Sequence, residues 1–189
     1  MQWVLETDRL LLRRFTEADA EAWLHMESDP EVLRYFGRGP RGDVEAYRQH
    51  IRLRVLPYYD RHEGLGGWVI IEKDSGDFLG ACSLRPALDS QIAAEMGFGK
   101  DEIDLGYGLR KKSWGKGYAT ELARALVRKA FTDCAAPLLV ASVTIANQAS
   151  VRVLEKAGLR RVGEPIYLPG IDEPKAKYAM TREQFQVLS

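Results

Sequence analysis

The clearest hydrophobic pattern in the chain begins just after Gly117, where apolar residues recur at intervals of three and four. Their positions are Ala119, Leu122, Ala123, Leu126, Val127, Ala130 and Phe131. Residues at this spacing share one face of an α-helix. The pattern therefore predicts an amphipathic helix of about four turns with its apolar face turned to the core.

The segments on either side of this helix have the composition of strands. EIDLGYGL at residues 102–109 leads into it, and PLLVASVTI at residues 137–145 follows it as the nearly continuous apolar run of a strand covered on both faces. The glycines within residues 102–109 indicate a bulge or the close approach of another backbone. Asn147 predicts the N-cap of a second helix, and Gly158 is well placed to end it.

The first third of the chain is expected to be mostly helical after one strand. LETDRLLLRRF at residues 5–15 predicts that strand. Thr16 and Asp19 have the spacing of a capping box, and Asp29, followed by a proline, is typical of another helix start. Residues 43–59 carry apolar side chains at helical spacing, so they predict one further helix.

Two hairpins complete the expected elements. The first joins GWVIIEK at residues 67–73 to FLGACSLR at 78–85, and the last joins VGEPIYL at 162–168 to KAKYAM at 175–180. Strands followed by helices and a closing hairpin indicate an α/β fold. With 189 residues and no repeat, low-complexity tract or linker, the chain is expected to form a single domain over residues 1–189.

The charge balance argues against several classes of partner. The 27 basic and 27 acidic side chains cancel, so no overall charge favours nucleic acid or an anionic membrane surface. The first residues meet charge before they could form the apolar core of a signal peptide, and no segment approaches the roughly 20 apolar residues of a membrane-spanning helix. We therefore expect a cytoplasmic protein that binds neither nucleic acid nor membrane.

Cysteine and histidine spacings predict no metal site. Cys82 and Cys134 lie far apart without CxxC spacing, so we expect buried free thiols. HEGLG, which starts at His62, begins like a zinc-protease motif, but Gly66 stands where the second histidine would be.

The stretch KKSWGKGYATELA at residues 111–123 places glycines and lysines at the start of the predicted helix. The first N–H groups of a helix lack partners within it and attract anions, so this stretch predicts a phosphate site. It is not a Walker loop, because Arg110 and Gly117 stand where that motif needs a glycine and a Ser or Thr. It is not a dinucleotide fingerprint either, because Thr120 replaces the third glycine.

Several separated motifs, in one order, resemble a single enzyme superfamily. DLGYGLRKKSWGKGYATELARALVRKAF, followed by NQASVRVLEKAGL, is similar to the GNAT superfamily of acyl-CoA-dependent N-acyltransferases. LETDRLLLRRFTEADAEAW and WVIIEKDSGDFLGACSLR further resemble its RimJ/RimL-like branch of protein N-terminal acetyltransferases. The resemblance covers nearly the whole chain. It implies the GNAT fold, an α/β (α+β) arrangement whose central, mostly antiparallel mixed sheet splays at the cofactor cleft and is flanked by helices.

The resemblance implies that the phosphate belongs to acetyl-CoA, the acyl donor. The family loop commonly opens with Gln or Arg, and Lys112 stands at that place here. The residues implied to bind the cofactor are Tyr107, Gly108, Leu109, Lys112, Trp114, Gly115, Lys116, Gly117, Tyr118, Ala119, Asn147 and Ser150. The first three would offer main-chain partners to the pantetheine arm. Trp114 is also explained as a packing residue beside the loop, and Asn147 as a helix cap.

The resemblance also implies two catalytic roles. Many members have a tyrosine that protonates the leaving thiolate, but Leu154 occupies its place here. Ser150, one turn earlier on the same helix face, is the candidate that replaces it, and a serine of the capping turn is the alternative. Asp104 is the candidate base for the acceptor amine, with a surface ion pair as the alternative.

Acceptor residues are expected in the first helices and the closing hairpin. They are Tyr35, Phe36, Asp172 and Glu173, with core packing and a solvated turn as alternatives. We interpret the chain as an N-acetyltransferase, a monomer or a homodimer, in which a primary amine attacks the thioester directly. The amine belongs to a protein N-terminus or to a small molecule such as an antibiotic, a polyamine or an amino-acid derivative. A non-catalytic CoA-binding sensor or regulatory module is the alternative function.

Overall fold

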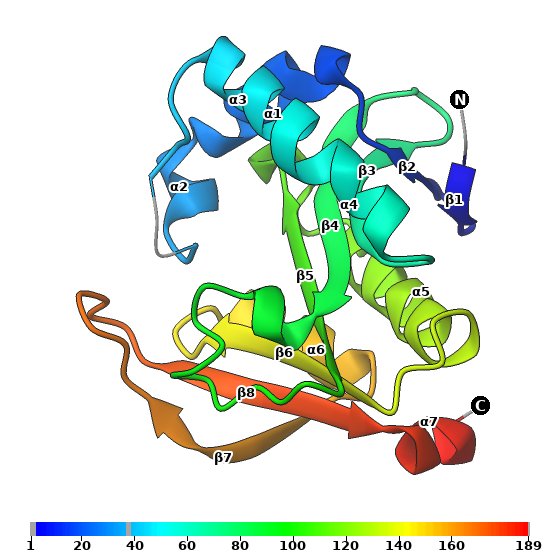
Figure 1. Ribbon diagram of the computed structural model, residues 1–189, viewed down its shortest axis with the longest axis vertical. Helices are drawn as coiled ribbons and strands as arrows, with labels where there is room; N and C mark the ends of the chain where they lie inside the picture. The colour runs from blue at the N-terminus through cyan, green and yellow to red at the C-terminus, as the bar shows by residue number, and fades with distance from the viewer. Residues whose placement is uncertain (1–2, 37–38, 189) are drawn as a thin grey trace. The chain divides into compact units, whose positions relative to one another are not determined.

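Helices and strands follow each other along the chain much as the hydrophobic pattern predicts (Figure 1). The computed structural model describes residues 3–36 and 39–188. The chain forms two compact units. The first comprises Met1–Ser83 and Tyr107–Leu122, and the second comprises Leu84–Gly106 and Ala123–Ser189. The organisation as a single domain over residues 1–189 stays a prediction.

The strands of the first unit are hydrogen bonded in the order β1-β2-β3-β4-β5. Their bounds are Trp3–Glu6 for β1, Leu10–Arg14 for β2, Gly66–Glu72 for β3, Phe78–Pro86 for β4 and Glu102–Leu109 for β5. The strands β4 and β5 also have residues in the second unit. β2 pairs with both β1 and β3 in antiparallel fashion. Leu10 and Leu12 are fully buried, which agrees with their alternation along β2.

Helices α1, α3 and α4 cover one face of this sheet (Figure 1). The helical segments of the first unit are a 3-10 turn Glu17–Asp19, α1 Ala20–Glu27, α2 Pro30–Leu33, α3 Val44–His50, a π-helical turn Ile51–Val55, α4 Leu56–Arg61 and a 3-10 turn Lys111–Ser113. The predicted caps are confirmed. The Asp19 carboxylate accepts from the Thr16 N–H at 2.8 Å, and the Asp29 carboxylate accepts from the Glu31 N–H at 2.9 Å.

Two segments differ from the sequence prediction. The chain around residues 5–15 forms a hairpin, β1 and β2, whose turn is closed by the Thr7 N–H donating to the Leu10 carbonyl at 2.9 Å. The residues of β1 are exposed or half-buried, so β1 lacks the alternation of a strand with one buried face. The helix over residues 43–59 is interrupted by the π-helical turn, which ends at Val55, two residues before Pro57, a residue without an N–H to donate.

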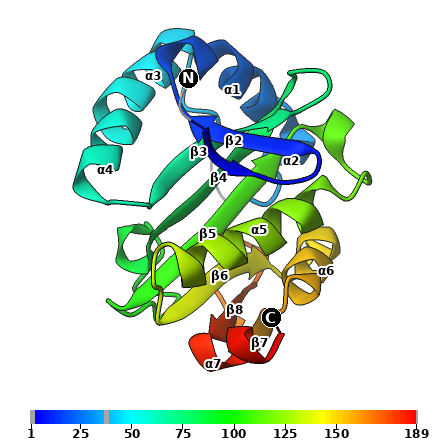
Figure 2. The same ribbon diagram turned by 90° about the vertical axis from the view of Figure 1, so that its right-hand side faces the viewer.

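The second unit orders its strands β4-β5-β6-β8-β7. Its further elements are a 3-10 turn Ala87–Asp89, β6 Leu138–Thr144, α6 Gln148–Lys156, β7 Arg160–Ile166, β8 Lys175–Thr181 and α7 Arg182–Leu188. β8 pairs with β6 and β7 in antiparallel fashion, which confirms the predicted closing hairpin. The helices α6 and α7 belong to this unit (Figure 2).

The amphipathic helix α5, Tyr118–Thr132, buries the face that the sequence predicts. The residues at most 4% exposed on it are Leu122, Ala123, Leu126, Val127, Ala130 and Phe131. Burying each leucine contributes about 1.5–3 kcal/mol to the free energy of unfolding. In the second unit the Phe131 ring stacks on Phe185 of α7 with centroids 4.9 Å apart. The helix α7 is not predicted, because its sequence REQFQVL carries few apolar residues.

The parallel pairing of β5 with β6 is short. It runs from the pair Glu102–Leu138 to the pair Asp104–Val140, although β6 continues to Thr144. In the described part of the second unit the pairing therefore ends at Asp104. The antiparallel pairs and this parallel one form the open, mostly antiparallel mixed sheet, flanked by helices, of the predicted α/β fold class, which is confirmed.

Candidate active site

The loop before α5 has a backbone that a ligand can approach closely. Gly115 and Gly117 have φ angles of 75° and 84°, left-handed values that glycine adopts without steric penalty. A Cβ added at Gly115 would meet no atom within 4 Å, and one at Gly117 would lie 3.4 Å from Arg9 Nη2. Trp114, Gly115, Lys116 and Gly117 are exposed. Main-chain atoms of this loop are thus open to solvent.

The main-chain N–H groups from Gly115 to Thr120 have no acceptor among the described residues. The next N–H, that of Glu121, donates to the Gly117 carbonyl at 3.1 Å and starts the helical bonding of α5. Unpaired N–H groups at a helix start, together with the macrodipole, favour an anion there. The loop and the first turn of α5 therefore have the properties of a phosphate site.

Glu121 fastens this loop to the turn between β1 and β2. Its carboxylate accepts from the Thr7 hydroxyl at 2.5 Å and from the Arg9 N–H at 2.9 Å. Arg9 Nη1 donates in turn to the Lys116 carbonyl at 3.0 Å. Burial raises the pKa of Glu121, but these hydrogen bonds outweigh burial and lower that pKa below its usual value. Sequence reasoning missed this tether, because Arg9 and Glu121 lie 112 residues apart and no motif links them.

The charged groups around the loop are held by neighbouring side chains. Lys112 Nζ lies 2.8 Å from the Asp77 carboxylate. This pair holds the pKa of Asp77 below its usual value. The Tyr118 hydroxyl donates to Glu72. An exposed pair such as Lys112–Asp77 contributes about 0–1 kcal/mol, so a phosphate can compete with Asp77 for the lysine.

The end of β5 packs a predicted cofactor residue against a predicted acceptor residue. A Cβ added at Gly108 would lie 2.7 Å from the Phe36 ring, and one added at Gly80 would lie 2.1 Å from the Gly108 carbonyl. Gly80 admits no side chain, because a Cβ there would strike main-chain atoms, whereas a Cβ at Gly108 would require the Phe36 ring to move. The Leu109 carbonyl accepts from the Trp114 indole N–H at 2.9 Å. Trp114 therefore packs against the strand end, and the Leu109 carbonyl is already engaged.

In the second unit, Asp104 is half-buried and presents a buried carboxylate oxygen. Its Oδ1 has no hydrogen-bond partner among the described residues. Burial raises the pKa of Asp104 to about 6, against the attraction of Arg85. A carboxylate with this pKa is mostly ionised at neutral pH and is a stronger base than an ordinary aspartate. These properties suit the role predicted for it.

Asn147 caps α6 as predicted. Its Oδ1 accepts from the Ser150 N–H at 3.1 Å, so Ser150 belongs to the capping turn through its main chain. Leu154, one turn further on, is 2% exposed. That position belongs to the core and has no proton donor.

The predicted acceptor residues differ in their exposure to solvent and in the unit to which they belong. Asp172 and Glu173 are exposed in the loop between β7 and β8. Tyr35 and Phe36 are half-buried after α2, and the Arg34 guanidinium lies 5.1 Å from the centre of the Tyr35 ring.

The predicted site residues are divided between the two units. The first unit holds Tyr35, Phe36, Tyr107, Gly108, Leu109, Lys112, Trp114, Gly115, Lys116, Gly117, Tyr118 and Ala119. The second holds Asp104, Asn147, Ser150, Asp172 and Glu173. Within the first unit, the glycine loop, the end of β5 and Phe36 are connected through Trp114 and Gly108.

The loop fits the diphosphate of coenzyme A, because free N–H groups and open space coincide there. Within residues 3–36 and 39–188, no three His, Cys, Asp or Glu side chains form a group that could hold a metal ion. No helix in the same residues is long and apolar enough to cross a membrane. Cys82 and Cys134 are free thiols, as predicted, although only Cys82 is buried.

Comparison with known proteins identifies the family. Residues 9–160 match the acetyltransferase (GNAT) domain family, and the chain therefore belongs to this family. It is 31% identical to the FsC-acetyl coenzyme A-N(2)-transacetylase of Aspergillus fumigatus over 97% of this chain and 78% of that protein. It is 29% identical to the N-acetyltransferase YoaA of Bacillus subtilis over 85% of this chain and 84% of that protein.

Solved structures share the fold. The GNAT-family acetyltransferase of Bacillus anthracis has a TM-score of 0.74 at 24% identity and covers 96% of this chain and 99% of its own. The structure of AAC(6')-Ib with ribostamycin and coenzyme A has a TM-score of 0.73 at 23% identity and covers 95% of this chain and 97% of its own. The predicted enzyme class, an acetyl-CoA-dependent N-acetyltransferase, is confirmed.

Proposed function

We propose that this enzyme transfers the acetyl group of acetyl-CoA to a primary amine by direct attack of the amine. The observation that carries the proposal is the row of unpaired main-chain N–H groups from Gly115 to Thr120. These groups and Lys112 bind the diphosphate. Tyr107, Gly108 and Asn147 bind the pantetheine arm.

The protein moves two protons in this reaction. Asp104 takes a proton from the acceptor amine on its carboxylate, directly or through a water molecule. Ser150 gives a proton from Oγ to the departing thiolate, which leaves as the thiol of coenzyme A. Acetyl-CoA supplies the activated thioester, so no protein side chain acts as a nucleophile. The buried Oδ1 of Asp104 and the position of Ser150 in the capping turn support these roles.

The acceptor is a protein N-terminus or a small molecule with a primary amine. The resemblance to the RimJ/RimL-like branch favours a protein N-terminus. The small-molecule acceptor is supported by AAC(6')-Ib, whose structure contains ribostamycin. In both cases Tyr35 and Phe36 contact the acceptor, and the exposed carboxylates of Asp172 and Glu173 attract its positive charge.

Thiol release from acetyl-CoA, measured against panels of peptides and small amines, tests this proposal. An acetyltransferase of this kind releases thiol only when a suitable amine is present, and mass spectrometry then finds the acetyl group on that amine. Turnover with peptides alone identifies a protein N-terminus as the acceptor. Tight binding of coenzyme A without turnover on any amine would instead identify a sensor or regulatory module.

A further inference from the structure

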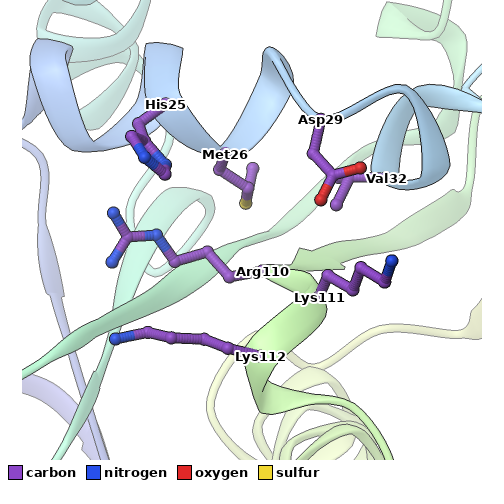
Figure 3. A pocket seen from close by; sticks show the side chains of 7 residues that line it. All are labelled: His25, Met26, Asp29, Val32, Arg110, Lys111 and Lys112. Atoms are coloured by element: carbon purple, nitrogen blue, oxygen red, sulfur yellow. The ribbon is translucent and has the colours of Figure 1, made fainter.

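A pocket in the first unit lies outside the roles described so far. Its volume is about 400 Å³, and it is lined from α1, α2 and the segment that follows β5 (Figure 3). The polar lining residues are His25, Asp29, Arg110, Lys111 and Lys112. Of these, only Lys112 is a predicted cofactor residue. The pocket therefore needs an explanation of its own.

Two of the four charged side chains in this pocket already have partners of opposite charge, and a third, Asp29, accepts a main-chain N–H. Lys111 pairs with Glu31, and Lys112 pairs with Asp77. Asp29 accepts the Glu31 N–H at the start of α2. Figure 3 shows the Asp29 carboxylate toward the opposite end of the pocket from the Arg110 guanidinium.

Arg110 forms no ion pair within 4 Å among the described residues, although the Asp77 carboxylate, which Lys112 already engages, is near enough to interact with it electrostatically. Its Nη1 donates to the Phe78 main-chain carbonyl at 3.1 Å, and its guanidinium lies 5.4 Å from the centre of the Phe78 ring. Its Nε is buried and has no hydrogen-bond partner. A guanidinium cannot lose its proton in a protein. The buried Nε–H of Arg110 is therefore an unused hydrogen-bond donor that belongs to a positively charged group. Such a group favours an acceptor that carries negative charge.

We propose that this pocket binds an oxyanion, a carboxylate or a phosphate, on Arg110, with the His25 ring as a further hydrogen-bonding group. Figure 3 shows the guanidinium of Arg110 beneath the His25 ring. The planar guanidinium matches both oxyanions because it offers several N–H donors in one plane. The inference rests on the proposed function, since the oxyanion is carried by one of its two substrates. The two sources are the 3′-phosphate of acetyl-CoA and an anionic group of the acceptor.

Nuclear magnetic resonance of the ¹⁵N-labelled full chain tests the pocket directly. Inorganic phosphate is the probe, and chloride at equal ionic strength is the control. The Nε–H signal of Arg110 should shift and saturate with phosphate and should stay in place with chloride. This signal is separate from the amide signals of Gly115 to Thr120, so phosphate at the start of α5 is not mistaken for phosphate in the pocket. An Arg110 signal that phosphate leaves unmoved overturns the proposal.

Kinetics with matched substrates identifies the source of the oxyanion. The variants are Arg110→Gln, Arg110→Lys and, as a control, Arg54→Gln, which removes the same charge from an exposed position of the first unit. If the 3′-phosphate is bound, Arg110→Gln should lower kcat/KM for acetyl-CoA about tenfold or more and leave that for 3′-dephospho-acetyl-CoA unchanged. Arg110→Lys should fall between Arg110→Gln and wild type, because lysine keeps the charge but not the planar fork.

If Arg110 instead binds an anionic group of the acceptor, the kinetic effects should appear with the acceptor and not with the cofactor. Arg110→Gln should then raise KM for acceptors with a carboxylate or phosphate about tenfold or more, and it should leave neutral acceptors and both cofactors unaffected. Equal effects on the anionic and neutral forms of both substrates overturn the proposal. The phosphate titration needs no turnover, so it decides the oxyanion pocket even if no amine is acetylated and the proposed function fails.

Discussion

Asp104 shows how one buried atom sets the reactivity of a side chain. Its Oδ1 has no partner among the described residues, so the charged form loses hydration without full replacement. Burial accordingly raises its pKa to about 6. The same desolvation makes Asp104 a better base and makes the folded protein less stable when Asp104 is ionised.

The first prediction concerns the pH dependence of catalysis. A base must be ionised to accept a proton, so kcat/KM should fall as the pH drops below about 6. Asp104→Asn should remove this acidic limb and lower kcat by about 10²- to 10⁴-fold. Asp101→Asn, at an exposed position, is the matched control. An acidic limb that persists in Asp104→Asn would assign the base to another group.

The second prediction concerns stability at the same residue. The pKa of Asp104 is raised in the folded state, so the folded state binds the proton more tightly and stability declines as pH rises from about 4 to about 6. Asp104→Asn removes this loss and should stabilise the protein by up to about 3 kcal/mol at pH 7. At pH 4 the two proteins should differ little. Urea unfolding at both values checks the sign, and a variant less stable at pH 7 contradicts it.

The third prediction concerns Ser150. If Oγ supplies the proton to the leaving thiolate, Ser150→Ala should lower kcat by roughly tenfold to a hundredfold, about 1.4–2.7 kcal/mol of barrier. The dissociation constant of acetyl-CoA should stay nearly constant. A serine that serves only the capping turn gives the reverse result, with a lower Tm and weaker cofactor binding but kcat at saturation unchanged. Measuring Tm, Kd and kcat on one preparation separates the two roles.

Among the elements, the start of α5 depends most on its glycines. Gly117→Val places a branched side chain at a φ of 84°, a strain of about 1–2 kcal/mol for a residue with a Cβ. It also disturbs the N–H groups around it, so coenzyme A should bind about tenfold more weakly or worse. Calorimetric titration of the folded variant measures this.

Gly163→Val is the matched control for Gly117→Val. Gly163 has a φ of 72° with no atom within 4 Å of an added Cβ, so it carries the same kind of strain in the second unit. We expect a similar loss of stability with normal coenzyme A affinity. An unchanged dissociation constant in Gly117→Val would remove the loop from the cofactor site.

Most elements could be predicted because their signals are local. The apolar spacing of α5, the Asn147 cap of α6 and the alternating strands all lie within short stretches of sequence. The exposed strand β1 and the helix α7 carry no such signal, since their stability comes from pairing and from single contacts such as Phe185 on Phe131. An irregularity in the helix near Pro57 could also be predicted from the sequence, because proline has no N–H to donate a helical hydrogen bond.

For the molecule as a whole, the sequence predicts the phosphate-binding loop better than it predicts contacts between residues far apart in the chain. The glycine loop and its free N–H groups follow from residues 111–123 alone. The tether from Arg9 to Glu121 and the packing of Phe36 on Gly108 join residues far apart in the chain, so no local pattern indicates them. The buried Nε of Arg110 and the buried Oδ1 of Asp104 likewise depend on tertiary packing.

The central claim is that the N–H groups at the start of α5 bind the diphosphate of coenzyme A. The most direct test is a titration of the ¹⁵N-labelled protein with coenzyme A, followed through the amide signals of Gly115 to Thr120. We predict large, saturating shifts of these signals, with the same dissociation constant that calorimetry measures. Coenzyme A that binds by calorimetry while these amide signals stay in place would contradict the account.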